Sequence, residues 1–375
     1  MNPVKVLHVV LSLEPGGLEN GLVNVARALN PDEFTLDVCC LEQAGQFAQR
    51  LPATSKVYVL AKRSGFSSRA VFDLARVIRA SNADVVHTHN LGNLIYASLA
   101  TGFSVVRPIL HSEHGELDRS DLSPKRLLQR KALYRCCRKV HTVSNGLREH
   151  LIRLGFQADR ICAFANGVDT SRFSPEASAD ARRRLGIDAD GPVIGIVARF
   201  IATKRHEVLF AAFEDLARDW PHAQLLVVGS GGPEHVRAMA LAKASPHANR
   251  IHMVGYQENP CPFYRAMDLL VLPSTIEGMS NVVLEAMACG VPALSHTVCG
   301  SAEIIESGVN GFLADLRTPE ALIRELRMIF SSSEQLKIMG QRARDTVLKR
   351  FALAEMVRQF RELYLSTARP IHGRP

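Results

Sequence analysis

The sequence offers little that would cross a membrane or form a framework of disulfide bonds. No apolar run reaches the roughly 18 to 20 residues that a membrane helix needs. The apolar start, residues 4–11, is shorter and less basic than a signal peptide. The eight cysteines show no Cys-x-x-Cys spacing, and their two adjacent pairs are poorly placed for internal bridges. We therefore expect reduced, mostly buried thiols in a cytoplasmic protein.

Several familiar catalytic signatures are also missing. The chain has no nucleophile turn of the G-x-S-x-G type, no Walker loop and no zinc signature. Gly16 and Gly17 follow the first apolar run and would let a backbone approach a ligand closely, but a plain tight turn fits equally well. His87 and His89 would share one strand face, yet no third metal ligand follows at suitable spacing. The sequence thus predicts no bound metal and no cofactor.

What the chain has in excess is positive charge. Its net charge is +8 and its pI about 9.2, which favours an anionic partner such as a nucleotide, a phospholipid surface or nucleic acid. The densest cations lie in residues 124–139, where no acid occurs. On a helix these cations would surround the axis, which fits either a solvated helix or contact with an anionic membrane. They lack the interleaved aromatics of a single-strand binder, so we expect no nucleic-acid partner.

Short apolar runs alternate with longer helical patterns throughout, which is typical of parallel sheets with helices on both faces. The 375 residues suffice for two such α/β domains. Turn-rich residues 166–192 break the rhythm, and we expect the linker there. The domains would span residues 1–185 and 190–350. The last helix, residues 352–368, carries an apolar stripe that could dock within its own domain or on the first domain, which we favour.

Two carboxylates eight positions apart, Glu277 and Glu285, are the most informative feature. The pattern around them predicts a strand, a loop and a helix, with Glu277 in the loop and Glu285 one turn inside the helix. The backbone N–H groups of Ser280, Asn281 and Val282 would lie between them at the helix start, which attracts anions. The segment suits a ligand with hydroxyls at both ends and phosphate in the middle, such as a nucleotide-sugar.

Other polar residues would also lie at the carboxyl ends of strands, where open α/β sheets bind ligands. Arg199 can grip phosphate oxygens through its guanidinium fork, and Lys204 can act as a point charge, although a surface pair of cations fits as well. In the first half, His114 can contact a bound sugar, and Glu113 can accept a proton or bind a hydroxyl. A purely structural histidine is the alternative.

Two backbone segments of the second half can meet a nucleotide. The glycine-rich turn that contains Gly229 and Gly231 follows a strand and can pass beneath a ribose or a diphosphate. The strand edge near Met253 and Val254 can hydrogen-bond a base. Neither segment is more than an ordinary turn or strand when taken alone.

Taken in order, these motifs resemble those of retaining GT-B glycosyltransferases of glycosyltransferase family 4. The pair Glu277 and Glu285 resembles the family's E-x7-E motif, and Arg199 and Lys204 resemble its phosphate-binding pair. The resemblance covers about residues 4–365. The Glu-His-Gly sequence around His114 is similar to that of sugar transferases from bacterial exopolysaccharide clusters, particularly those found with exosortase systems.

The resemblance implies two Rossmann-like domains whose parallel sheets face each other across a cleft, with the acceptor on the first and the donor on the second. Glu285 would hold the ribose, Glu277 the hydroxyls of the transferred sugar, and His114 would orient that sugar. Arg199 and Lys204 would neutralise the leaving diphosphate in place of a metal ion. Transfer would retain the anomeric configuration by a front-face route without a protein nucleophile.

The expected donor is a UDP-sugar, with a GDP-sugar as the alternative. The expected acceptor is a glycan or lipid-linked oligosaccharide of bacterial surface or exopolysaccharide synthesis, at the inner face of the cytoplasmic membrane. Residues 278–281 and 298–300 depart from the usual family pattern, which leaves the sugar open. The alternative functions are a nucleotide-sugar epimerase or a phosphorylase on the same fold, and a non-catalytic module that binds a glycan or a nucleotide.

Overall fold

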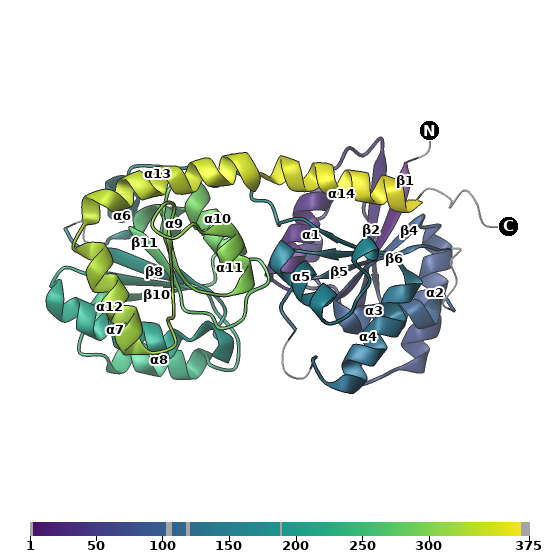
Figure 1. Ribbon diagram of the computed structural model, residues 1–375, viewed down its shortest axis with the longest axis horizontal. Helices are drawn as coiled ribbons and strands as arrows, with labels where there is room; N and C mark the ends of the chain where they lie inside the picture. The colour runs from purple at the N-terminus through teal and green to yellow at the C-terminus, as the bar shows by residue number, and fades with distance from the viewer. Residues whose placement is uncertain (1–2, 103–106, 118–120, 188–189, 369–375) are drawn as a thin grey trace. The chain divides into compact units, whose positions relative to one another are not determined.

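The computed structural model describes residues 3–102, 107–117, 121–187 and 190–368. The chain divides into two compact units (Figure 1): the first is Met1–Gly167 with Leu353–Pro375, and the second is Val168–Ala352. Each unit contains one sheet in which all the paired strands are parallel. Two Rossmann-like α/β units therefore make up the fold, as the alternation of apolar runs predicted.

The first unit contains a seven-stranded sheet with the order β3-β2-β1-β4-β5-β6-β7. Its strands are β1 (Val4–Ser12), β2 (Phe34–Gln43), β3 (Val57–Val59), β4 (Val85–His89), β5 (Ile109–Glu113), β6 (Cys137–Thr142) and β7 (Ile161–Ala163). Its helices are α1 (Gly17–Ala28), α2 (Ser68–Ser81), α3 (Asn90–Ala100), α4 (Pro124–Cys136), α5 (Asn145–Arg153) and α14 (Leu353–Ala368). The strand order reverses between β1 and β4, the kind of switch point at which such sheets bind ligands.

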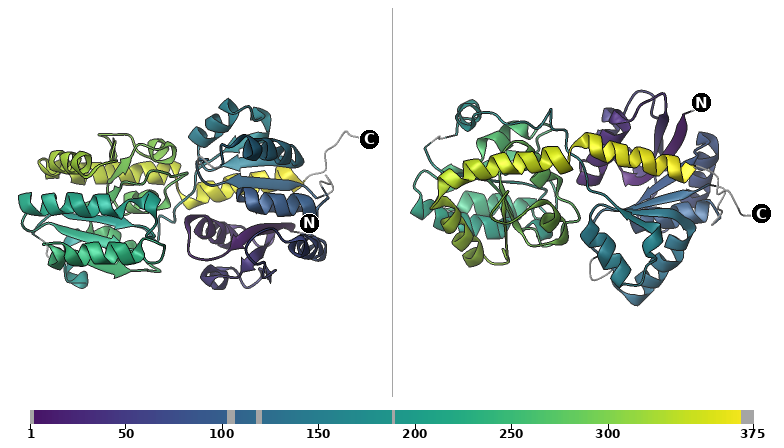
Figure 2. Two further views of the ribbon diagram at one scale, coloured as in Figure 1. Left: turned by 90° about the horizontal axis from the view of Figure 1, so that it is seen from below. Right: turned by 45° about the horizontal axis from the view of Figure 1, so that its top comes forward.

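The second unit contains a six-stranded sheet with the order β10-β9-β8-β11-β12-β13. Its strands are β8 (Val193–Val197), β9 (Gln224–Val228), β10 (Ile251–Gly255), β11 (Leu269–Leu272), β12 (Ala293–His296) and β13 (Phe312–Ala314). Its helices are α6 (Ser178–Leu185), α7 (His206–Asp219), α8 (His235–Ala244), α9 (Cys261–Ala266), α10 (Asn281–Ala288), α11 (Cys299–Ile304), α12 (Pro319–Phe330) and α13 (Ser333–Arg350). Figure 2 shows helices on both sides of this sheet.

Burial on both faces explains the continuous apolar strands. All residues of β9 and β11 are buried, because helices cover the sheet above and below. In the second unit, α7, α8 and α12 pack their apolar side chains against β8, β9 and β11 in one core. In the first unit, α2, α3 and α4 contribute to a core on one face of the sheet, and α1 and α14 form a separate core with β1, β2 and β4.

The last helix belongs to the first unit, which was the favoured of the two predicted positions. Its buried residues Met356, Phe360, Leu363 and Tyr364 complete the core that α1 forms. These four belong to the predicted stripe, whose other members, Leu353 and Val357, are partly buried against the same core. The apolar face of α14 (Figure 1, in yellow) is therefore covered by the first sheet and α1.

The first unit ends earlier than the expected residue 185. Val168 N–H donates to the carbonyl of Phe351 at 2.9 Å, and both residues lie in the second unit. Helix α6 also packs there, because its buried Arg182 forms an ion pair with Asp268 at 2.7 Å. These contacts could not be predicted from the sequence, because residues 166–192 look like a polar, turn-rich linker. Residues 188 and 189 of the expected linker lie outside the described residues.

No helix in the described ranges combines the length and the apolar character needed to cross a membrane. The side chains of seven cysteines are described, and each is a free thiol. Cys39, Cys40 and Cys137 are among the buried ones. Burial raises the pKa of Cys39 and Cys40 to about 12, so these thiols pack as small apolar side chains.

Candidate active site

Lys204 and Glu277, 73 positions apart in the sequence, meet at the carboxyl end of the second sheet. Lys204 ends a short 3-10 turn (Ala202–Lys204) after β8, and Glu277 lies in the loop after β11, the strand beside β8. The Lys204 ammonium donates to Glu277 Oε1 and forms an ion pair with it. A backbone hydrogen bond of 3.0 Å from Thr275 to Thr203 joins the same two loops. The fold thus brings together two of the predicted residues in one charged pair.

Arg199 follows β8 in the same loop and is exposed. Within the described part of the chain, its guanidinium has no hydrogen bond or ion pair. Lys204 is engaged with Glu277, whereas Arg199 is available to an anionic ligand. At the carboxyl end of the second sheet, the charge of Lys204 is therefore balanced by Glu277, whereas that of Arg199 is not balanced by a described residue.

The glycine-rich turn after β9 lies directly on the backbone of the loop that holds Arg199. A Cβ atom at Gly229 would lie 2.0 Å from the Ala198 carbonyl oxygen, and Gly229 has a φ of 144°. The Gly231 carbonyl accepts a 3.0 Å hydrogen bond from the Phe200 amide. Glycine is required at position 229 because a side chain would collide with the neighbouring backbone.

Helix α10 begins at Asn281, directly after Ser280 in the N-cap position. The Ser280 hydroxyl is buried and makes no hydrogen bond within the described residues, so it does not cap the helix. A serine in this position ordinarily satisfies one of the first N–H groups. The first turn, which includes Val282, therefore keeps the anion-attracting character expected from the sequence.

Glu285 lies one turn inside α10 and is partly buried. Its Oε2 accepts a 2.8 Å hydrogen bond from the hydroxyl of Tyr264, a fully buried residue of α9. Burial, together with the neighbouring Glu285 carboxylate, raises the pKa of Tyr264 well above its usual value. The hydroxyl therefore remains a donor that fixes one oxygen of Glu285. Sequence reasoning missed Tyr264, because nothing in its local pattern differs from an ordinary core tyrosine.

His206, the first residue of α7, was also missed. Both of its ring nitrogens are buried without a hydrogen-bond partner in the described part of the chain. Burial, together with the neighbouring charge of Lys204, lowers its pKa to about 4. The ring centroid lies 4.4 Å from that of Phe200. His206 therefore packs as a neutral ring beneath the loop that carries the two cations.

The predicted strand edge belongs to β10, which ends the second sheet on one side. The Met253 side chain packs against the core. The Val254 carbonyl accepts from the Gln257 side chain at 3.2 Å, and the Gly255 carbonyl accepts from the Gly229 amide at 2.8 Å. The strand end and the glycine-rich turn are therefore joined directly.

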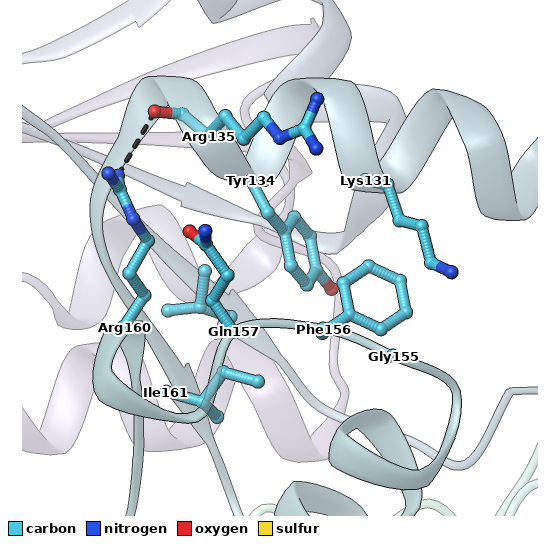
Figure 3. Close-up of a pocket in the computed structure, with 9 residues that line it drawn as sticks. Lys131, Tyr134, Arg135, Gly155, Phe156, Gln157, Arg160 and Ile161 are labelled. Carbon is cyan, nitrogen blue, oxygen red and sulfur yellow. Dashed lines mark hydrogen bonds between the residues drawn. The ribbon is translucent and has the colours of Figure 1, made fainter.

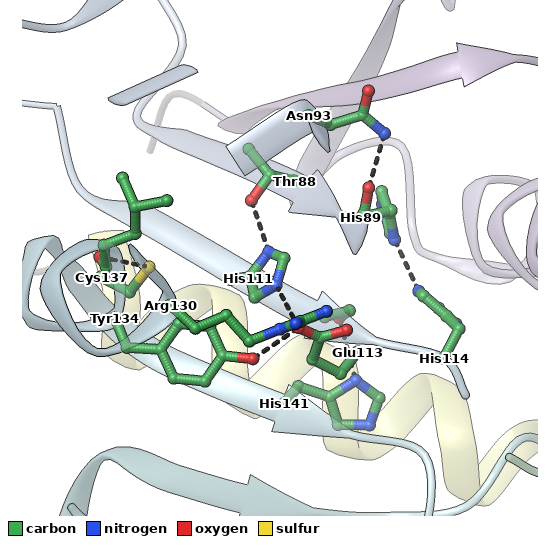
Figure 4. A network of polar contacts seen from close by, with 12 residues as sticks. Thr88, His89, Asn93, His111, Glu113, His114, Arg130, Tyr134, Cys137 and His141 are labelled. Carbon is green, nitrogen blue, oxygen red and sulfur yellow. Dashed lines mark hydrogen bonds and ion pairs between the residues drawn. The ribbon is translucent and has the colours of Figure 1, made fainter. Parts of the chain in front are cut away.

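The predicted residues of the first unit lie at the carboxyl ends of β1 and β5. Gly16 and Gly17 connect β1 to α1, where a Cβ atom at Gly16 would meet the Glu19 carboxylate at 2.2 Å. His114 follows β5 and is partly exposed. The nitrogens His114 Nε2 and His89 Nδ1 form a 2.8 Å hydrogen bond (Figure 4).

A third histidine lies beside His87 and His89, although the sequence showed no third metal ligand. His8 lies opposite His87 in the parallel register of β1 and β4. One ring nitrogen of each of the three buried histidines lies within 4.8 Å of the others. The linear sequence concealed His8 because it comes from another strand. His8 is also hydrogen-bonded to His89, and the Tyr364 hydroxyl is hydrogen-bonded to both His8 and His87.

Glu113 is an internal ion pair and not a free base or a sugar-binding group, contrary to the interpretation of the sequence. Its Oε1 accepts from Arg130 Nε at 3.0 Å and from the Tyr134 hydroxyl at 2.5 Å, and lies 3.4 Å from His111 Nε2 (Figure 4). Burial by itself would raise the pKa of Glu113. His111, Arg130 and Tyr134 outweigh that effect and lower the pKa to about 2.

The basic segment 124–139 therefore contains one cation that serves the core, since Arg130 is buried. Helix α4 and residues 155–161 border a small pocket in which apolar side chains lie beside cations (Figure 3). Arg160 at its rim donates to the Arg135 and Cys137 carbonyls. The Lys131 ammonium lies 5.8 Å from the ring centroid of Phe156. Lys131 and the exposed Arg135 side chain have no acidic partner among the described residues.

Comparison with known proteins gives matches in both units. The family model described as Glycosyltransferase Family 4 matches residues 15–172, and the model described as Glycosyl transferases group 1 matches residues 178–346. The N-acetyl-alpha-D-glucosaminyl L-malate synthase of Bacillus anthracis is 28% identical over 204 residues, which are 54% of this chain and 53% of that protein. The chain thus matches about half the length of this relative.

Two further similarities extend over nearly the whole chain. The UDP-Gal:alpha-D-GlcNAc-diphosphoundecaprenol alpha-1,3-galactosyltransferase of Escherichia coli is 22% identical over 376 residues, covering 96% of this chain and 97% of that protein. The crystal structure of Anabaena HepE in complex with UDP and glucose has a TM-score of 0.84 and 22% identity, covering 97% and 100% of the two chains. At this identity the structural likeness shows a common GT-B fold.

Proposed function

The chain belongs to the GT-B glycosyltransferases of the family 4 type, and on this premise we propose that it transfers a sugar from a UDP-sugar to a glycan or lipid-linked oligosaccharide. The transfer would be metal-independent and would retain the anomeric configuration. The observation that carries this proposal is the Lys204–Glu277 pair, which lies shortly before α10, together with Arg199, which has no ion pair among the residues that the structure describes.

Arg199, Lys204 and the first turn of α10 together suit a diphosphate that gains negative charge as it leaves. Both cations follow β8 at the carboxyl end of the sheet, where they could stabilise the negative charge as it develops. The helix start adds backbone N–H groups for the distal phosphate. These groups would provide the charge neutralisation that a divalent metal supplies in other transferases.

The two glutamates suit the hydroxyl-bearing ends of the donor. Glu285, whose Oε2 is fixed by Tyr264, would bind the ribose. Glu277 would bind the transferred sugar, and its ion pair with Lys204 favours a binding role over an attacking nucleophile. In a front-face reaction the leaving diphosphate oxygen would accept the proton of the acceptor hydroxyl. His114 of the first unit would contact the sugar.

The choice of a UDP-sugar is supported by the UDP named for HepE and the UDP-galactose named for the E. coli relative. The same relative's name includes a diphosphoundecaprenol acceptor. Helix α4, with Lys131 and Arg135 beside an apolar pocket, suits an anionic lipid surface carrying such an acceptor. These features support our proposal that the reaction belongs to surface or exopolysaccharide synthesis at the inner face of the cytoplasmic membrane.

The test incubates the purified chain with UDP-sugars and GDP-sugars, with and without lipid-linked acceptors, and measures nucleotide release and the linkage formed. Glu277→Gln and Lys204→Met should each lower transfer by about a hundredfold or more, because each removes a charged group from the site. Lys243→Met, an exposed cation on α8, is the matched control and should remain active.

Other results would overturn parts of the proposal. Full transfer by the Glu277 or Lys204 variant would remove that residue from the site. Loss of transfer in EDTA would contradict metal independence, and an inverted anomer would contradict retention. Conversion of the donor sugar without an acceptor would favour an epimerase, and nucleotide binding without any turnover would favour a non-catalytic module.

A further inference from the structure

A continuous line of hydrogen-bonded polar groups, most of them buried, connects His114 to the Phe164 carbonyl, which directly follows β7. Neighbouring members lie 2.8 to 3.3 Å apart. We call this line the histidine network. In order, its members are the Phe164 carbonyl, His141, Ser112, His87, Tyr364, His8, His89 and His114. The parallel register explains why they meet. His8 on β1 lies opposite His87 on β4, and His89 is two positions farther along β4. Ser112 on β5 lies opposite both His89 and His141.

The direction of the hydrogen bonds is fixed at the end farthest from His114. A carbonyl oxygen can only accept, so His141 Nε2 must carry a hydrogen and donate to the Phe164 carbonyl at 3.0 Å. In a neutral ring His141 Nδ1 then accepts, and the Ser112 hydroxyl donates to it at 2.9 Å. That hydroxyl has one hydrogen, so Ser112 Oγ accepts from His87 Nε2 at 2.8 Å.

The hydrogen bonds between His87 and His114 have the same direction. His87 Nδ1 accepts from the Tyr364 hydroxyl at 3.0 Å, and Tyr364 in turn accepts from His8 Nε2 at 3.3 Å. His8 Nδ1 accepts from His89 Nε2 at 2.9 Å. Finally, His89 Nδ1 accepts from His114 Nε2 at 2.8 Å. Each ring thus donates through Nε2 and accepts through Nδ1.

The direction of the hydrogen bonds is fixed along the network when every ring is neutral, and the surroundings favour that state. Burial lowers the pKa of His8 and of His114 to about 3, and that of His141 to about 4. Burial, with the neighbouring rings, also lowers the pKa of His87 and His89 well below the usual value. Each ring therefore carries one hydrogen at neutral pH, so the direction set at one end reaches the other.

We propose that the histidine network sets the tautomer of His114, so that His114 Nδ1 presents a lone pair and accepts a hydrogen bond from a hydroxyl of the bound donor sugar. His114 is partly exposed, and its Nδ1 has no partner within the described residues. Ser112, Tyr364 and His141 are then positioning residues that act through His114. The contact with sugar rests on the proposed function, whereas the tautomer itself follows from the network alone.

The first test records two-bond proton–nitrogen correlation spectra of the full chain labelled with 15N-histidine. The expected result is the Nε2–H tautomer for His114 in the wild-type protein. In Ser112→Ala, His87 loses its acceptor and the direction is no longer fixed, so His114 should lose its single tautomer. Ser112→Thr keeps the hydroxyl and should restore it. If Ser112→Ala fails to fold, Tyr364→Phe breaks the same line elsewhere.

The second test measures transfer. In Ser112→Ala and Tyr364→Phe, kcat/KM for the donor should fall about tenfold, the effect of one lost hydrogen bond, while the Kd for UDP should remain unchanged. Tyr96→Phe, a hydroxyl outside the network that accepts from the Ser67 amide, is the matched control and should retain wild-type transfer.

The two tests separate the inference from the proposed function. An Nδ1–H tautomer in the wild-type protein, or an unchanged His114 tautomer in both Ser112→Ala and Tyr364→Phe, overturns the network even if sugar transfer is normal. Stoichiometric zinc bound through His8, His87 and His89, with loss of their N–H signals, overturns it as well. The expected tautomers without any sugar transfer support the network and count against the proposed function.

Discussion

Replacing Arg130 by methionine should destabilise the first unit strongly, because it leaves the Glu113 carboxylate buried without a cation. Arg130 and Glu113 are each 3% exposed, and Arg130 Nε lies 3.0 Å from Glu113 Oε1. Breaking a buried pair from one side costs about 3–5 kcal/mol. The pKa of Glu113 is lowered to about 2 by His111, Arg130 and Tyr134 together, so Arg130 supplies part of this stabilisation of the carboxylate. For a unit of this size the loss would lower Tm by about 6–20 °C.

The measurement is thermal unfolding followed by circular dichroism, with the fluorescence of the single tryptophan, Trp220, reporting on the second unit. Arg126→Met removes an exposed cation from the same helix and should shift Tm by no more than about 1–2 °C. Adding Glu113→Gln to Arg130→Met removes the uncompensated charge and should recover part of the loss. If Arg130→Met and Arg126→Met have the same Tm, the buried-pair reasoning is refuted.

Three further predictions concern pH, donor binding and the glycine turn. Because the pKa of Glu113 is lowered, its contribution to stability is complete above about pH 4.5 and is lost as the pH falls toward about 2; acid unfolding that is identical in wild type and Arg130→Met contradicts this. Tyr264→Phe should raise the Kd for UDP about fivefold in calorimetry, because Glu285 loses a positioning hydrogen bond; an unchanged Kd contradicts that role. Gly229→Ala should lower the unfolding temperature reported by Trp220, because the added Cβ meets backbone at 2.0 Å; an unchanged temperature refutes the close approach.

The position of the second-unit residues at one end of the sheet could be predicted from the sequence, because these residues follow strands of one parallel sheet. Once the apolar runs are assigned to strands, the loops that follow them must reach the same edge. Arg199, Lys204 and Glu277 follow β8 and β11, which are neighbours in the sheet. The strand pattern alone was therefore enough to predict that these residues lie close together, without knowledge of the packing.

The first-unit network could not be predicted because it depends on register and burial. His8, Ser112 and Tyr364 come from two strands and the last helix, and nothing in the local sequence marks them as partners. The same limit applies to Glu113, where a polar residue at a strand end looked available to a ligand. Its actual partners, Arg130 and Tyr134, lie on α4, so the role of the carboxylate depends on a helix that the local motif does not include.

Tyr364 gives the last helix, α14, a second role in the first unit besides packing. Among the described members of the histidine network, the others lie on strands or directly after them, and Tyr364 alone comes from a helix. Its ring also packs in the core, with the centroid of Phe360 at 5.7 Å and that of Phe34 at 6.1 Å. Removing α14 would destroy the packing and the hydrogen bonds together. Tyr364→Phe keeps the ring and removes one oxygen, so it separates the stability that α14 supplies from the direction it imposes on the histidines.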